Sequence, residues 1–79
     1  MHANRTTQYV VVPYRVANGG LIAGQVRQAS TDIGAINLAQ AMADKAAGIA
    51  AYEVIIDTET GEMDAPCILW KCGDVPELD

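Results

Sequence analysis

The sequence predicts an α+β fold, a two-layer ββαββ arrangement in which a single helix packs on one face of a mainly antiparallel four-stranded sheet. Two observations lead to this prediction. Four segments rich in β-branched and aromatic residues surround one alanine-rich segment that has helix-capping residues at its start. The even-numbered positions of the expected strands are largely apolar, which indicates one face covered by the helix. These apolar positions are Val10, Val12, Tyr14, Val16, Ile22, Val26, Tyr52, Val54, Ile56, Ile68 and Trp70.

The first hairpin is expected from residues 9–16 and 21–29, which are separated by a glycine-rich segment. A two-residue loop over 18–19 would place Val12 opposite a glutamine and mix core with solvent positions on one face. A three-residue loop, longer by one glycine, places Val12 opposite Val26. We therefore expect the three-residue loop, with glycine in the left-handed conformation.

The helix is expected over residues 33–47. Residues 30–32 supply hydroxyl and carboxylate groups that can accept from the first free amides, and Gly48 is expected to end the helix. The small side chains of the apolar face would let the helix lie close to the sheet. This face consists of Ala35, Leu38, Ala39, Met42, Ala43 and Ala46.

The second hairpin is expected from strands over 49–57 and 67–72, with a type I turn closed by a glycine bulge at residues 58–62. This register pairs Tyr52 with Ile68 and Ala50 with Trp70.

The order of the strands depends on Pro13. A helix that returns the chain along one face favours the all-antiparallel order 2-1-3-4, in which the first strand is central. Proline has no amide hydrogen and is disfavoured in a central strand. Two solutions remain open: a bulge at Pro13, or the order 1-2-3-4 with the first strand at an edge.

One domain is expected over residues 1–79, with 1–7 and 73–79 as flexible termini. No apolar run approaches the roughly 18 residues that a membrane-spanning helix requires. The first residues lead into a polar segment and do not resemble a signal peptide. We therefore expect a cytoplasmic protein with no membrane partner.

Charge is unevenly distributed along the chain. Residues 1–51 hold four basic and two acidic residues, a net +2, whereas residues 52–79 hold one lysine and eight carboxylates, a net −7. Such an acidic end attracts basic surfaces and repels nucleic acid and anionic membranes. Arg15 and Arg27 near Tyr9 are the arrangement closest to a nucleic-acid platform, but the net charge of −5 disfavours direct nucleic-acid binding.

No motif for catalysis, a cofactor or a metal accompanies this charge. The carboxylates of the second hairpin lack the glycine and glutamate positions of an EF-hand loop. Cys67 and Cys72 are five residues apart in one strand, so we expect them on opposite faces, with one thiol buried and no disulfide between them. We expect a protein that is not an enzyme and binds no cofactor or metal.

The odd-numbered face of the sheet is less polar than a solvated face should be. Its apolar positions include Val11, Ile55 and Leu69. Because the helix is expected on the other face, we expect these three side chains to contribute to self-association.

Three functional hypotheses follow. The first is a non-enzymatic protein-protein interaction module, a small acidic inhibitor of the phage or mobile-element type, which docks on a basic, nucleic-acid-binding partner. Its partner-binding residues would be Asp57, Glu59, Glu62, Asp64 and Trp70. The second is a small homodimeric accessory or structural protein, and the third a small-molecule binder at a dimer junction.

Overall fold

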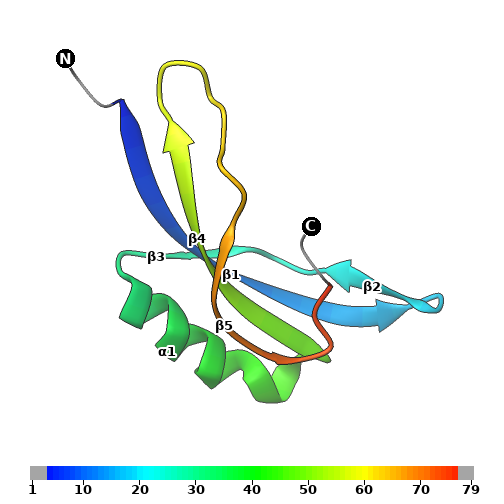
Figure 1. Cartoon of the computed structure of the whole chain (residues 1–79). Coiled ribbons are helices and arrows are strands. Elements are labelled where there is room, and N and C mark those ends of the chain that lie inside the picture. Colours follow the sequence, from blue (N-terminus) through cyan, green and yellow to red (C-terminus); the bar gives the residue numbers. More distant parts are fainter. Residues whose placement is uncertain (1–3, 77–79) are drawn as a thin grey trace.

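The computed structural model describes residues 4–76 and places one helix against an antiparallel sheet (Figure 1). The elements are β1 (Arg5–Ala17), β2 (Gly20–Ala23), β3 (Arg27–Ala29), α1 (Asp32–Met42), the 3₁₀ turn η1 (Ala43–Lys45), β4 (Gly48–Asp57) and β5 (Cys67–Gly73). The molecule measures 47 × 25 × 18 Å, and its radius of gyration of 13.5 Å exceeds the value of about 12 Å typical of a compact domain of this length.

The strand order is β2-β1-β4-β5, and β3 pairs with the same side of β1 as β2. Of the two strand orders that the sequence left open, 2-1-3-4 is therefore the one observed. Pairing of β1 with β4 runs from Arg5 opposite Asp57 to Tyr14 opposite Gly48. Residues 5–7 thus belong to β1 and Gly73 belongs to β5, although both were expected in flexible termini; residues 1–3 and 77–79 lie outside the described residues.

The first hairpin turns through two residues, and the predicted three-residue loop is wrong. Asn18 and Gly19 have φ values of 53° and 80°, the pair of left-handed conformations that defines a type I′ turn. Val16 consequently pairs with Leu21. Farther along, β1 pairs with β3 in the register that a three-residue loop would have given, because one extra residue lies between β2 and β3.

Pro13 lies opposite the segment between β2 and β3, which contains the extra residue. Its carbonyl accepts a hydrogen bond of 2.7 Å from the Gly24 amide, but it has no N–H to return. Regular pairing of β1 with β2 stops after Ala23, and pairing of β1 with β3 begins at Arg27. A proline is thus accommodated in a central strand by interrupting its neighbour, as the first of the two solutions for Pro13 predicted.

The helix begins one residue before its predicted start, at Asp32, and ends at Met42, five residues before its predicted end at residue 47. Thr31 is the N-cap, and its Oγ1 accepts a hydrogen bond of 2.9 Å from the Gly34 amide. The last predicted turn is the 3₁₀ turn η1, and Gly48 begins β4 instead of capping the helix. Ala35 and Ala39 are fully buried, so the alanine-rich face does lie against the sheet.

The helix covers the odd-numbered positions of β1 and β4, and the prediction that it covers the even-numbered ones is wrong. The helix-side cluster contains Val11, Ala35, Ala39, Ile49 and Ala51, each at most 1% exposed. Ala35 and Ala39 of the helix have short side chains, so the helix can contact the sheet closely where the sheet residue is also short, as Ala51 is. The even-numbered face has two tyrosines, Tyr14 and Tyr52, within its buried cluster, whereas the fully buried sheet residues beneath the helix are Val11, Ile49 and Ala51.

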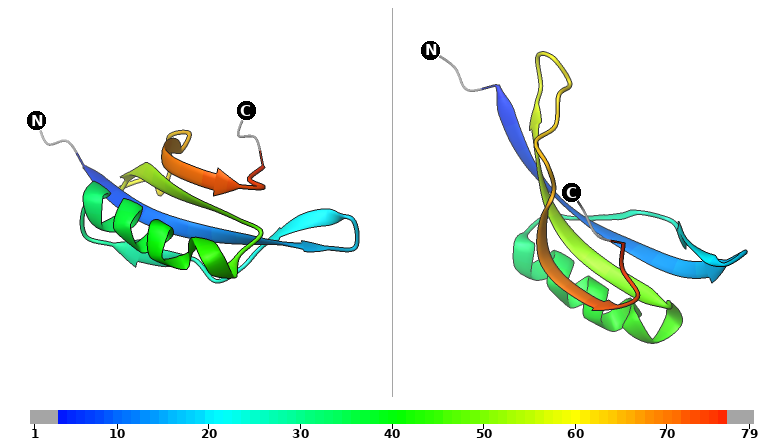
Figure 2. Two further views of the ribbon diagram at one scale, coloured as in Figure 1. Left: turned by 90° about the horizontal axis from the view of Figure 1, so that it is seen from below. Right: turned by 45° about the vertical axis from the view of Figure 1, so that its right-hand side comes forward.

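The opposite face is also buried, without a helix. Its buried cluster contains Val12, Tyr14, Ala50, Tyr52 and Val54, and packed against this cluster are Val10, Leu21, Ile56 and Val75. Val75 follows β5, so the chain turns back across this face after its last strand (Figure 2). Apolar residues at both parities of β1 and β4 therefore belong to two buried clusters.

Two glycines allow the chain to turn back. A Cβ on Gly48 would overlap the Asp74 carbonyl, and one on Gly73 would overlap the Ala47 carbonyl. Gly73 also has φ +74°, and the Asp74 amide donates a hydrogen bond of 3.1 Å to the Ala47 carbonyl. The start of β4 and the end of β5 therefore cross at a separation that only glycine permits.

A bulge interrupts the pairing of β4 with β5. Tyr52 lies opposite Ile68, as predicted, but Ala51 and not Ala50 lies opposite Trp70, which leaves Leu69 as the extra residue. The bulge places Trp70 on the helix-bearing face, where it packs against the helix-side cluster. The expectation that Trp70 contacts the helix layer is confirmed, although its register is not the predicted one.

Candidate interaction surfaces

An acidic turn ends the two-stranded part of the sheet that extends past the helix (Figure 1). The Asp57 amide and the Gly61 amide close a four-residue loop with bonds of 2.8 Å to the Glu62 and Asp57 carbonyls. Gly61 has φ +78°, so the predicted left-handed glycine is confirmed. The Asp57 carboxylate accepts from the Glu59 amide at 2.9 Å, which makes it a structural part of the turn.

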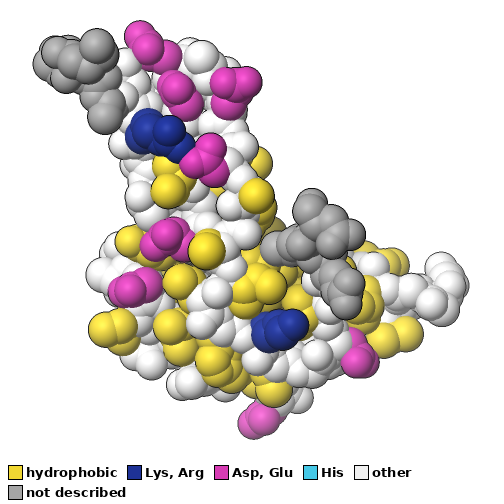
Figure 3. Space-filling view, in the orientation of Figure 1, with side chains coloured by type: hydrophobic (Ala, Val, Ile, Leu, Met, Phe, Trp, Pro, Cys, Tyr) yellow, Lys and Arg dark blue, Asp and Glu magenta, His cyan; other side chains and the backbone are white. Residues whose placement is uncertain are grey.

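We call Asp57, Glu59, Glu62 and Asp64 the acidic tip. Acidic side chains gather at this projecting end in the space-filling view (Figure 3). Asp64 forms an ion pair with Arg5, and both side chains are more than half exposed. An exposed pair of this kind contributes little to stability. Glu59 and Glu62 are exposed and are left as the carboxylates best placed to meet another molecule.

Trp70 does not lie with the acidic tip. It pairs with Ala51, six positions along β4 from Asp57, which is about 20 Å at the usual rise of a strand. Its side chain is half-buried and packs against the helix-side cluster. The five predicted partner-binding residues therefore form two separate groups, a charged projection and a core aromatic.

The three residues expected to mediate self-association do not share an open face. Val11 is fully buried beneath the helix, and Leu69 packs against the same cluster. Ile55 is half-buried and pairs with Thr7 in the part of the sheet that extends past the helix. The helix already occupies the face on which the self-association hypothesis relied. Tyr9, the aromatic of the conceivable nucleic-acid platform, packs against this cluster too.

A pair of tyrosines lies inside the opposite face. The Tyr14 and Tyr52 hydroxyls are 3.0 Å apart and hydrogen-bonded. Burial raises the pKa of Tyr52 well above its ordinary value of 10.0, and the hydrogen bond with Tyr14 raises it further. A hydroxyl held in its neutral form has no tendency to act as a base at neutral pH, so this pair is a structural element.

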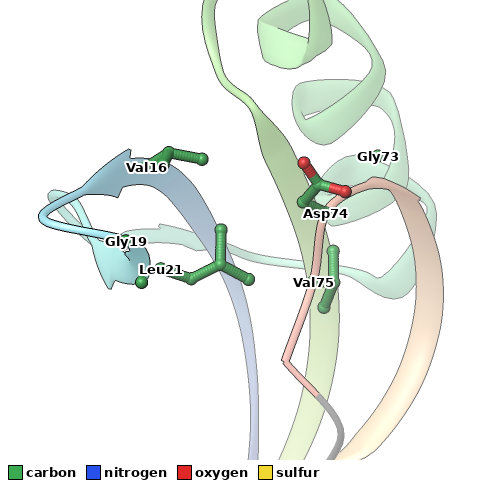
Figure 4. Close-up of a pocket in the computed structure, with 7 residues that line it drawn as sticks. Val16, Gly19, Leu21, Gly73, Asp74 and Val75 are labelled. Atoms are coloured by element: carbon green, nitrogen blue, oxygen red, sulfur yellow. The ribbon is translucent and has the colours of Figure 1, made fainter.

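An open groove of about 370 Å³ lies between the end of the first hairpin and the segment that follows β5 (Figure 4). Val16 and Leu21 form one wall, and Gly73, Asp74 and Val75 form the other. Val16 is 59% exposed there. Among the described residues that line the groove, Asp74 alone has an ionisable side chain, and these residues include none of the clustered acids, bases or nucleophiles that an enzyme site requires.

Both cysteines are free and exposed, which corrects the expectation that one is buried. Cys67 lies opposite Glu53 and Cys72 opposite Ile49, so the bulge places both on the helix-bearing face instead of on opposite faces. In the described part of the chain, no three His, Cys, Asp or Glu side chains gather where they could hold a metal ion. No helix among residues 4–76 is long and apolar enough to cross a membrane.

Two features were missed in the sequence, and a signal was present for the first of them alone. Gly48 and Gly73 stand at the facing ends of two strands, which is where backbones can cross closely. The five-residue spacing of the exposed cysteines is odd, and only a bulge brings such residues to one face. No residue type in β5 marks that bulge.

Comparisons of this chain with protein-family models, curated proteins and solved structures found no match.

Proposed function

We propose that this protein is a non-enzymatic interaction module whose acidic tip docks on the basic surface of a partner protein. The observation that carries the proposal is the position of the tip, which stands at the end of two strands that extend past the helix. A charged turn on such a projection can reach into a concave or nucleic-acid-binding surface that the body of the molecule cannot enter.

The charges of the tip support a division of roles. Asp57 holds the turn and Asp64 is paired with Arg5, whereas Glu59 and Glu62 are exposed, and the Glu62 carboxylate accepts a long hydrogen bond of 3.5 Å from the Thr60 hydroxyl. Exposed interface charges act mainly on the rate of encounter and on partner choice. In this proposal Glu59 and Glu62 steer the protein to its partner, and a partner that normally binds nucleic acid would be blocked by it.

The test compares two double variants that each remove two negative charges. Glu59→Gln with Glu62→Gln neutralises the tip, and Asp44→Asn with Asp74→Asn neutralises exposed carboxylates elsewhere. Both should melt within a few degrees of the wild type, because each exposed charge contributes less than about 0.5 kcal/mol. Each protein is then used as bait, and captured proteins are identified by mass spectrometry.

The proposal expects a basic protein that the wild type and the control variant retain, that the tip variant loses, and that moderate salt releases. Its association rate with the tip variant should fall at least several-fold. Identical captured proteins for all three baits would overturn the proposal, because the carboxylates of the tip would then serve solubility alone.

A further inference from the structure

One edge of the sheet is formed by β5. In the described residues β5 pairs only with β4, and it is the longest strand at either edge, with seven residues against four in β2 and three in β3. Figure 2 shows it along the outer side of the sheet. An edge strand presents unpaired N–H and C=O groups along its free side, which can pair with a strand of another chain.

The bulge gives β5 a symmetric pattern. Cys67 and Cys72 lie opposite odd-numbered residues of β4 and share the helix-bearing face. Ile68 and Lys71 lie opposite even-numbered residues, Tyr52 and Ala50, and share the other face. In a regular strand, Cys67 and Cys72 would lie on opposite faces, and so would Ile68 and Lys71, because both spacings are odd. Because Leu69 is the extra residue, side chains alternate between the two faces in the same order whether the strand is followed from Cys67 or from Cys72.

We propose that β5 pairs in antiparallel fashion with β5 of a second copy of this chain, so that Cys67 lies opposite Cys72 of the partner subunit. A two-fold axis between Leu69 and Trp70 produces this register, and it requires that Cys67 and Cys72 share a face, as they do. The two bulges meet at the axis, so the new hydrogen bonds form on both sides of it.

The side chains of β5 fit this register. Cys67, Ile68, Lys71 and Cys72 are all exposed in the single chain and therefore free to contact a second copy. Ile68, which is 41% exposed, comes to lie opposite Lys71 of the partner subunit. The two lysines therefore do not face each other, and the lysine stems can pack on the isoleucines.

The cysteines provide a direct measurement of the register. Residues directly opposite in an antiparallel pair have Cα atoms about 4.5–5.5 Å apart, which is disulfide distance. Within one chain, Cys67 and Cys72 lie opposite residues four apart on β4, about 13 Å along the strand, and cannot bond. With oxidised glutathione, each disulfide between subunits forms from two thiols, and their two electrons and two protons yield two reduced glutathiones.

The experiment oxidises the full chain as wild type, as Cys67→Ser, as Cys72→Ser, and as an equimolar mixture of these two variants. We expect cross-linked dimer from the wild type and from the mixture, at least tenfold faster than from either variant alone. Peptide mapping should identify a Cys67–Cys72 bond between chains. Equal rates in all four samples would indicate random collision and overturn the proposal, as would absence of a cross-linked dimer from the mixture.

A second measurement needs no disulfide. With both cysteines replaced by serine, Ile68→Lys places a lysine opposite Lys71 of the partner subunit, whereas Ile68→Glu places a carboxylate there. Sedimentation equilibrium should show weaker dimerisation for the first and stronger for the second, relative to the isoleucine parent. Met63→Lys, outside β5 and 63% exposed, is the control and should not change it. An equal change for the lysine and glutamate variants would overturn the register.

Salt separates this proposal from docking by the acidic tip. Each chain carries a net charge of −5, so screening should strengthen pairing of two copies and weaken binding to a basic partner. Dimerisation that weakens with added salt would contradict pairing through β5 and leave the proposed docking untouched.

Discussion

The two faces of the sheet reach similar burial by different means. On the helix-bearing face, Val11 and Ala51 are covered by a helix whose fully buried residues are two alanines, Ala35 and Ala39. On the opposite face, Tyr14 and Tyr52 are covered by their neighbours, by the end of the first hairpin and by the segment after β5. The comparison teaches that a small chain with one helix can bury both sides of a sheet when large side chains and a returning segment replace a second layer.

The largest expected effect is on the helix-bearing face. Val11→Asp should abolish folding, because an unpaired carboxylate beneath the helix costs several kcal/mol, comparable to the whole stability of a small domain. Val16→Asp, on the same strand at a position 59% exposed, should remain folded. Circular dichroism and thermal melting measure both. A cooperative transition near the wild-type temperature for Val11→Asp would contradict the assigned face.

The next effect concerns the segment that covers the opposite face. Gly48→Ala should destabilise the protein by about 2 kcal/mol or more, because the new Cβ overlaps the Asp74 backbone and displaces the segment that carries Val75. Gly20→Ala is the control, since no atom lies within 4 Å of its Cβ position. Urea denaturation gives both free energies of unfolding. Equal values for the two variants would show that the crossing does not hold the segment.

A pair of neighbouring alanines compares the two faces directly. Ala50 and Ala51 are both fully buried and point in opposite directions. Ala51→Leu should cost about 1–3 kcal/mol, because the helix must move to make room. Ala50→Leu should cost less, since the returning segment is easier to displace than a helix. The free energies of unfolding decide the comparison, and a greater loss for Ala50→Leu would identify the opposite face as the more rigid one.

The smallest effect is expected at the tyrosine pair. Tyr52→Phe should cost about 1 kcal/mol at neutral pH, since it removes one buried hydrogen bond. The raised pKa of Tyr52 also predicts a pH dependence. Its contribution is fully present below about pH 10 and is lost as pH rises above that, because the unfolded chain releases the phenolic proton first.

Absorbance at 295 nm and alkaline unfolding measure this dependence. Tyr52→Phe should lose less stability than the wild type between neutral pH and pH 11. An identical loss in the two proteins would assign alkaline unfolding to other groups.

The element types followed from the sequence because local signals agreed with one another, whereas the strand order was narrowed to two solutions, one of which is observed. The β-branched segments, the Thr31 cap and Gly61 each specify a local conformation that the fold retains. The position of Pro13 even indicated where pairing would be interrupted.

The face of the sheet could not be predicted by hydrophobicity alone, since both parities of β1 and β4 are apolar. Side-chain length would have been the better guide: the alanines of the helix require a face with short residues such as Ala51, and Tyr14 with Tyr52 mark the other one. Of the candidate site, the acidic tip was recognisable from charge. The separation of Trp70 from it was not, because it follows from strand length and from a bulge that no residue type announces.

The central place of β1 has a kinetic consequence. Its partner β4 lies 34 residues away in sequence at the Tyr14–Gly48 pair and 52 residues away at the Arg5–Asp57 pair. Contacts over such separations require closure of long loops before they yield any stabilisation, and proteins dominated by them fold slowly. β1 leaves the ribosome before β4 and must therefore wait for β4 to be synthesised. Until then only the local pairing of β1 with β2 and β3 can form, and the helix has no completed sheet on which to pack.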